Sequence, residues 1–240
     1  RTGETWAQQQ KLLSSDIAIS DYFGYSVGIS GNYAVVGSYG VNENGDESGS
    51  VFVFKRTGET WAQQQKLLSS DIAESDYFGY SVAIDGDYIV VGAHLNDDTQ
   101  NNSGSVYIFN RSGNTWSQQQ KLVASDAELE ANFGNSVQID GSKIIVGAWL
   151  DDYVTNNSGS AYIFNRVGNV WSEEKKIIST DAASNDQFGI SVAINDSYVL
   201  VGANLNDDST VNSGTAYLFN YTTKNSILDI EGTINNQDSG

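Results

Sequence analysis

The feature that most constrains the fold of this chain is an internal repeat of constant length. A tryptophan, a Phe-Gly pair and a Ser-Gly pair recur four times in phase, and every interval is 55 residues without insertion or deletion. Self-similarity at a fixed period is typical of architectures that array one structural unit several times. The repeats therefore predict one repeat domain over 1–220 and a C-terminal tail or linker over 221–240, with units at 1–55, 56–110, 111–165 and 166–220.

The second unit illustrates the four strands that each unit predicts. Residues 78–84 alternate large apolar side chains with Gly, Ser and Ala, which indicates a strand with one almost bare face, suited to a crowded place. Residues 88–93 are apolar on both faces, as in a strand buried between layers. Residues 104–109 form the third strand. The glutamine-rich stretch 116–123 predicts a fourth strand on the wetter, outer side.

Turns and connections favour one fold class over its alternative. Asp85-Gly86 is a two-residue hairpin signal between the first and second strands. The chain has no proline, and we find no helical periodicity. Four antiparallel strands per unit are typical of a β-propeller blade. A β-solenoid is the alternative, but its coils are shorter than 55 residues. We therefore predict an all-β protein built as a β-propeller of four-stranded antiparallel blades.

The order Phe-Gly, Val-Gly-Ala, Ser-Gly resembles the FG-GAP repeat of integrin α-subunit propellers. It is closer to bacterial surface proteins whose repeats carry a Trp…Gln-Lys-Leu strand, and the likeness covers 1–220. The resemblance implies a non-enzymatic adhesion or matrix-attachment module that is extracellular or at the cell surface. One departure is the third letter of the "GAP" element, which is not proline here but Tyr39, His94, Trp149 and Asn204 in the four units.

Closure of the ring has two alternatives. Residues 5–13 read as an outer strand without a sheet, and the tail lacks such a strand, so the N-terminal segment could complete the last blade and close a ring of four. Integrin-type propellers have seven blades, which makes part of a seven-blade ring the other arrangement. Self-association through the termini is a further expectation. Because Arg1 falls inside a repeat, we expect a processed or excised piece of a longer protein.

Composition excludes some partners. Thirty acidic residues against twelve lysines and arginines give a net charge of −18, which argues against binding nucleic acid or anionic membranes. No apolar run is long enough to span a membrane. The chain has no cysteine, so it can form neither a disulfide nor a thiolate site. The charge favours cations or partners with basic patches.

The predicted topology places much of the acid on one side. In a propeller, the loops from strand four to the next strand one and the loops from strand two to strand three share one rim. Nineteen of the 30 acidic residues, and no lysine or arginine, fall in these loops. We call this surface the acidic rim; it consists of 14–22, 69–77, 124–132 and 179–187, and of 39–48, 94–103, 149–158 and 204–213.

A cation site is one interpretation of this acid. Calcium prefers several oxygen ligands from flexible loops, and the candidate ligands are Asp97, Asp98, Asp151, Asp152, Asp207 and Asp208. The alternative is that these residues are good turn formers that confer solubility. Integrin propellers bind calcium between strands one and two, where this chain has only two-residue turns, so the metal residues of that family cannot be carried over.

Four residues at one position of the repeat are candidate ligand contacts. Tyr39, His94, Trp149 and Asn204 stand where the second strand reaches the acidic rim, and they differ in size and chemistry. Function tends to lie in such loops on a rigid scaffold, and aromatic and amide groups suit a sugar or a peptide; they could also be tolerated rim residues. We predict a binding module for an extracellular protein or glycan. If calcium orders the acidic loops, this binding depends on calcium. The alternatives are a structural building block of a surface assembly and a lectin-like propeller.

Overall fold

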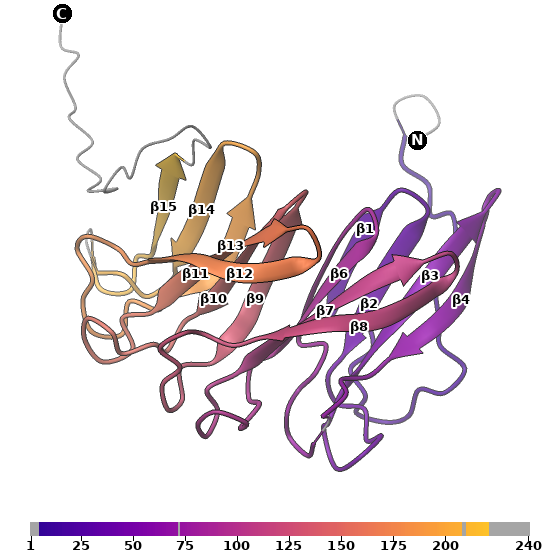
Figure 1. The fold of residues 1–240 in the computed structure, drawn as a ribbon, viewed down its shortest axis with the longest axis horizontal. Coiled ribbons are helices and arrows are strands. Elements are labelled where there is room, and N and C mark those ends of the chain that lie inside the picture. Colours follow the sequence, from indigo (N-terminus) through magenta and orange to yellow (C-terminus); the bar gives the residue numbers. More distant parts are fainter. Residues whose placement is uncertain (1–4, 72, 208–209, 221–240) are drawn as a thin grey trace, which may run out of the picture.

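The computed structural model describes residues 5–71, 73–207 and 210–220, and these contain fifteen strands in four sheets (Figure 1). Each sheet is antiparallel with neighbouring strands in chain order, and we call the sheets blades 1 to 4. Blade 1 consists of β1 (Ser26–Ser30), β2 (Tyr33–Ser38), β3 (Ser50–Thr57) and β4 (Thr60–Leu67). Blade 2 consists of β5 (Ser81–Asp85), β6 (Tyr88–Ala93), β7 (Ser105–Ser112) and β8 (Thr115–Leu122). Blade 3 consists of β9 (Phe133–Asp140), β10 (Lys143–Ala148), β11 (Ser160–Val167) and β12 (Val170–Ile177). Blade 4 has β13 (Phe188–Ile194), β14 (Tyr198–Ala203) and β15 (Thr215–Asn220). No helix in the described ranges could span a membrane.

The predicted strands are confirmed, with one shift at the first strand. β6 covers the predicted 88–93, and β7 and β8 lie within a few residues of their predictions. β5 begins three residues late, because Phe78 pairs in a parallel bridge with Gly49 and Gly79 has a left-handed φ of 91°. Between β5 and β6 the turn residues are Gly86 and Asp87, and Gly86 also has a positive φ.

The hydrophobic core lies between blades. Val35, Val51 and Val53 on one face of blade 1 pack against the facing side of blade 2 around Phe78 and Ile84. The same arrangement joins blade 2 to blade 3 and blade 3 to blade 4. A second strand such as β6 therefore has neighbours on both faces, as its uniformly apolar sequence predicts.

One close approach between blades involves two glycines and a serine. The carbonyl oxygen of Gly134, in the Phe-Gly pair of blade 3, accepts a hydrogen bond of 2.7 Å from Ser81 Oγ of blade 2. A Cβ added to Gly92 would lie 1.9 Å from that oxygen. We call Ser81 and Gly92 a socket, since they receive the carbonyl of the next blade. Equivalent sockets are Ser26 with Gly37 and Ser136 with Gly147.

Glutamine side chains join the outer strands. The Gln65 amide of β4 donates to the carbonyl of Trp116 at 2.7 Å, and the Trp116 amide donates back to Gln65 at 2.9 Å. Gln120 and Trp171 repeat this pair between β8 and β12. The outer strand thus keeps its polar side chains because they bond the backbone of the following blade.

The four blades form an open arc. Blade 1 packs on blade 2, blade 2 on blade 3 and blade 3 on blade 4, while the described parts of blades 1 and 4 do not pack on each other. Figure 1 shows β13–β15 and β3–β4 at opposite ends of the row. The expectation of a closed four-blade ring is therefore not met, because no described strand brings the two ends together. The predicted tail, 221–240, lies outside the described residues.

Because the sockets have no room for a side chain, we expect Gly92→Ala to lower the free energy of unfolding by about 1–3 kcal/mol. The matched control is Gly202→Ala in blade 4, where the added Cβ meets only the Ser191 hydroxyl, which can rotate away. Denaturant titration of both variants in dilute solution measures the difference. Equal losses would contradict the role of the socket.

Candidate functional site

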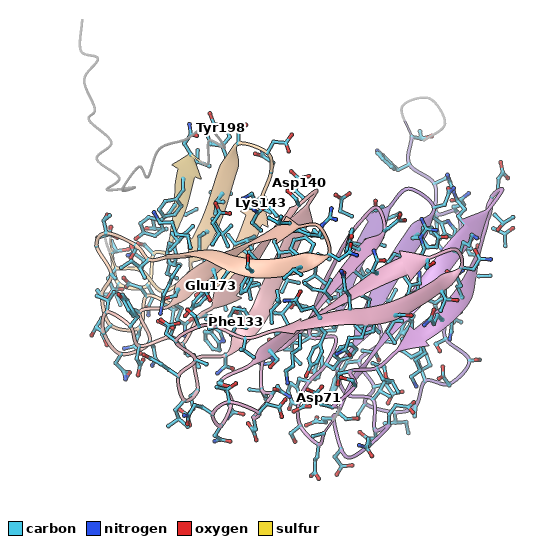
Figure 2. All side chains as sticks on the ribbon, viewed as in Figure 1. Asp71, Phe133, Asp140, Lys143, Glu173 and Tyr198 are labelled. Carbon is cyan, nitrogen blue, oxygen red and sulfur yellow. The ribbon has the colours of Figure 1, made fainter. Side chains whose placement is uncertain are left out.

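The two kinds of acidic loop lie side by side. The amides of Ser75 and Tyr77, in the loop that leads into blade 2, donate to the carbonyls of Asp46 and Glu47 in the loop of blade 1. The same pairs of bonds recur at the next two junctions. Figure 2 places Asp71 on one edge of the molecule and Asp140 and Tyr198 on the other. The acidic rim predicted from topology is thus a continuous surface.

Three of the candidate metal ligands close their own loops. Asp97 accepts a hydrogen bond from the Asn102 amide at 2.7 Å, five residues along the chain. Asp152 and Asp207 make the same bond in blades 3 and 4. These loops therefore use a carboxylate to satisfy a backbone donor, which is the behaviour expected of turn formers.

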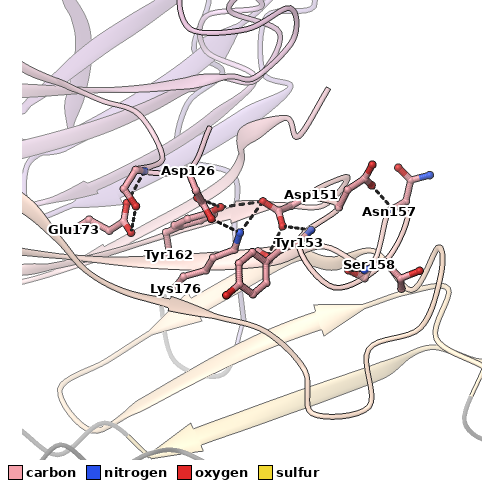
Figure 3. Close-up of polar contacts among 12 residues, drawn as sticks. Asp126, Asp151, Tyr153, Asn157, Ser158, Tyr162, Glu173 and Lys176 are labelled. Atoms are coloured by element: carbon pink, nitrogen blue, oxygen red, sulfur yellow. Dashed lines mark hydrogen bonds and ion pairs between the residues drawn. The ribbon is translucent and has the colours of Figure 1, made fainter. Parts of the chain in front are cut away.

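Asp151 belongs to a buried network rather than to the surface (Figure 3). Its side chain is 1% exposed in the ion pair that it forms with Lys176 at 3.0 Å. Tyr162 donates to both Asp151 and Asp126, at 2.9 Å each. Burial disfavours charge on Asp126, but hydrogen bonds from Lys176 and Tyr162 outweigh it and hold the pKa of Asp126 below its usual value.

Sequence reasoning missed the lysines of this surface. The acidic loops contain no lysine, yet Lys66, Lys121 and Lys176 reach the rim from the outer strands. Each pairs with one acid from the loop before its blade and one from its own blade, as Lys121 does with Asp71 and Asp98. The signal was present in the repeated Gln-Lys-Leu motif, whose lysine points back to the rim.

Calcium binding stays a prediction. The part of the chain that the structure describes contains no group of three or more His, Cys, Asp or Glu side chains that could hold a metal ion. Asp208 lies outside the described residues, so the Asp207–Asp208 pair is described only in part.

Aromatic side chains gather on the rim ends of blades 1 and 2. The Tyr22 and Tyr39 rings are stacked, with centroids 4.8 Å apart and planes within 8°. Tyr39 also contacts Tyr25, Tyr77 and Tyr80. Both Tyr77 and Tyr80 contact His94, at centroid distances of 5.7 and 4.0 Å. We call these six residues the aromatic cluster: Tyr22, Tyr25, Tyr39, Tyr77, Tyr80 and His94.

The cluster has an exposed side and a buried side. Tyr22 and Tyr25 are each 50% exposed, whereas His94 is 7% exposed and its Nδ1 has no hydrogen-bond partner among the described residues. Burial lowers the pKa of His94 to about 4. Burial and a hydrogen bond to Glu47 raise the pKa of Tyr77 to about 12, so its hydroxyl stays protonated.

Two of the four predicted ligand residues are thus brought together. Tyr39 and His94 lie in one cluster, joined through Tyr77 and Tyr80. Trp149 is half-buried and makes no ring contact in the described ranges, and Asn204 is exposed. The sequence analysis missed the four other tyrosines, although the positions before and after Phe-Gly vary in the same way, from Tyr in blades 1 and 2 to Asn, Gln or Ile in blades 3 and 4.

Comparison with known proteins identifies the repeat. The family model described as FG-GAP repeat matches residues 6–54, 61–109, 116–164 and 171–219. The chain belongs to the FG-GAP repeat family. Each matched FG-GAP repeat begins at the outer-strand tryptophan and continues through the three inner strands of the following blade, so residues 6–14 belong to the first repeat.

Structural comparison adds little to this. The chain is similar to Sqt1 from Saccharomyces cerevisiae with a TM-score of 0.47 and 10% identity, over 77% of this chain and 43% of that one. This chain therefore spans less than half the length of that protein. The search of curated proteins gives no match.

The burial of His94 predicts a pH effect on stability. Its folded pKa of about 4 lies below the ordinary value of 6.5, so the unfolded state binds a proton first as the pH falls. Between pH 6.5 and 4 the fold should lose about 3 kcal/mol relative to a chain without this group.

The matched variant is His94→Asn, because blade 4 has an asparagine, Asn204, at the equivalent position. Denaturation from pH 7 to 4 should show the wild type losing stability more steeply than the variant. The carboxylates titrate in both proteins and cancel in the difference. Parallel profiles would contradict the assignment.

Proposed function

We propose that this FG-GAP repeat chain is a non-enzymatic binding module that works outside the cell or at its surface and holds a protein ligand through the acidic rim. The observation that carries the proposal is the aromatic cluster, in which Tyr39 and His94 are brought together with tyrosines that are half exposed. Exposed aromatic rings on a rigid scaffold are the side chains that dominate binding energy at protein interfaces.

The backbone before each Phe-Gly pair has a positive φ in all four blades. Tyr22 and Tyr77 have φ values of 55° and 58°, and Asn132 and Gln187 have 58° and 59°. Bulky residues are disfavoured in this region. In blades 1 and 2 this conformation places the Tyr22 and Tyr77 rings against Tyr39.

The charges around the cluster indicate the chemistry of the ligand. Glu47 accepts the hydroxyl hydrogen of Tyr77 at 2.8 Å, so a carboxylate stands at the edge of the rings. Lysine and arginine bind both carboxylates and aromatic faces. A protein segment with exposed basic residues therefore fits the surface better than an acidic one. A glycan is the second candidate, because the half-exposed rings of Tyr22 and Tyr25 could pack against a sugar ring.

We expect Tyr25→Ala to weaken binding about tenfold or more, since loss of a central aromatic contact costs at least 1–2 kcal/mol. The assay is binding to an array of lysine- and arginine-rich peptides and to a glycan array. The control is Val170→Ala, which removes an exposed apolar side chain at the turn between β11 and β12, on the opposite rim. Binding of basic peptides should also weaken with added salt.

If the chain binds glycans but no peptides, and Trp149→Ala abolishes the glycan binding, the proposal of a protein ligand is wrong and a lectin function takes its place. Binding that both Tyr25→Ala and Val170→Ala leave unchanged would place the ligand elsewhere on the molecule.

If calcium orders the rim loops, it should raise the melting temperature at constant ionic strength, because a ligand that binds only the folded state stabilises it. Sodium at the same ionic strength is the control for screening. Asp98→Asn should reduce the shift, while Asp140→Asn, on the opposite rim, should not. The absence of any shift would remove calcium from the proposal.

A further inference from the structure

Both ends of the arc expose side chains that are buried at every internal junction. Val27 and Ile29 of blade 1 are each 69% exposed, whereas their counterparts in blade 2, Val82 and Ile84, are 8% exposed. At the other end Leu218 is 64% exposed. Its counterparts in blades 1 to 3 are 0–1% exposed; they are Val53, Ile108 and Ile163. Leu200 of β14 is exposed in the same way. We call these the leading face of blade 1 and the trailing face of blade 4.

The trailing face also carries an empty socket. Ser191 and Gly202 of blade 4 stand where Ser81 and Gly92 stand in blade 2, and a Cβ added to Gly202 would meet only Ser191. The group that fills such a socket is the carbonyl of a Phe-Gly glycine from a following blade. Gly24 is that glycine in blade 1, and a Cβ added to it would meet nothing within 4 Å. One end of the chain thus has the socket and the other has the group that fits it.

The outer strand shows the same relation. Residues 5–13 hold the position against blade 1 that β4 holds against blade 2, because Gln10 and Trp61 exchange the two bonds that join Gln65 and Trp116. Yet residues 6–13 belong to none of the four sheets, while blade 4 has three described strands, and no described strand pairs with the outer edge of β15. Trp6 is 85% exposed, although Trp116 and Trp171 are buried.

Charges are also complementary between the two ends. Lys11 is the counterpart of the rim lysines and forms no ion pair with a described residue. Asp181 is the counterpart of the acids that those lysines bind, such as Asp71 and Asp126, and no described lysine or arginine pairs with it. Asp181 accepts a hydrogen bond from Tyr217 at 2.9 Å, as Asp126 does from Tyr162.

We propose that a second copy of this chain docks head to tail on the trailing face of blade 4. Its leading face covers Leu200 and Leu218, its Gly24 carbonyl fills the socket of Ser191 and Gly202, and its residues 5–13 become the outer strand of blade 4. The occupant is a second copy because this interface already occurs three times within the chain, between blades related by the 55-residue repeat.

The junction is heterologous, because it joins two different surfaces. Such contacts either close into a ring or continue as an open chain of subunits. Two copies supply eight blades, which is within the four to eight that propellers have. In a closed dimer both junctions form, so neither leading nor trailing face is left exposed.

The first test is the mass in solution, measured by light scattering or sedimentation over a range of concentrations. The expected mass is at least twice the 25.9 kDa of the chain. We expect Leu218→Asp, Val27→Asp and Gly202→Ala each to prevent association. Val167→Asp, an equally exposed apolar residue away from both faces, should leave it intact. A monomer at all concentrations would overturn the proposal. It would do so equally if the reason is that another segment of the parent protein normally covers these two faces.

Mixing two variants separates a head-to-tail junction from any symmetric one. Leu218→Asp retains a functional leading face and Val27→Asp retains a functional trailing face, so each alone should be monomeric, but together they should form a one-to-one complex. Variants that each remain associated, or a mixture that stays monomeric, would overturn the assignment of faces.

The contribution of residues 5–13 is tested by a charge exchange. Lys11→Asp should weaken association up to about fivefold, the effect of one exposed ion pair, and Asp181→Lys in the same chain should restore it. If Lys11→Asp has no effect, or the double variant is no better than the single one, the proposed position of this segment is wrong.

Discussion

The fold depends on the insertion of a backbone carbonyl from one blade between a glycine and a serine of the blade before it. The Gly134 carbonyl occupies this place between Gly92 and Ser81, and the two equivalent junctions have the same geometry. Two of the three glycine-containing motifs of the repeat, Val-Gly-Ala and Phe-Gly, are therefore parts of one contact. The Val-Gly-Ala glycine makes room, while the Phe-Gly glycine adopts the left-handed φ that presents its carbonyl. Neither motif is required by a single blade; both are required by the contact between blades.

The acidic rim also depends on one interaction that recurs from blade to blade. One lysine from each outer strand binds two acids from separate loops, as Lys121 does with Asp71 and Asp98. Except for Lys176–Asp151, whose carboxylate is buried, the pairs are partly exposed, so each of these adds little stability by itself. Their value is positional, since they fix the loop before a blade relative to the loop within it. The remaining acid is left for solubility or for binding, which separates structural carboxylates such as Asp151 from exposed ones such as Asp152.

Much of the fold could be predicted from the sequence, because each local pattern recurs four times at a constant spacing of 55 residues. The strands, the blade, the shared rim and the buried second strand all follow from alternation and turn residues. Open or closed geometry could not be predicted, because it depends on the small rotation between blades. The burial and hydrogen bonding of individual aspartates could not be predicted from the sequence either. Asp151 and Asp152 are adjacent and chemically identical, yet one is buried under Lys176 and the other closes a surface loop. The aromatic cluster forms across two repeats, so its parts look unremarkable within either repeat alone.

In this molecule the burial of a strand depends on whether its blade has a neighbouring blade on each face, more than on the sequence of the strand itself. β10 and β14 are equivalent strands with similar apolar sequences, KIIVGA and YVLVGA, but β10 is buried on both faces and β14 on only one, because blade 4 has no described blade beyond it. In a repeat array of this kind stability is close to a sum of unit and nearest-neighbour terms. In blade 1, part of the nearest-neighbour stabilisation comes from Leu12, which packs against the apolar cluster that contains Phe52 and Phe54. The last unit carries an apolar face without that term. The trailing face of blade 4 keeps the apolar residues of the internal units, such as Leu200 and Leu218, which is the composition expected of a surface that has a partner.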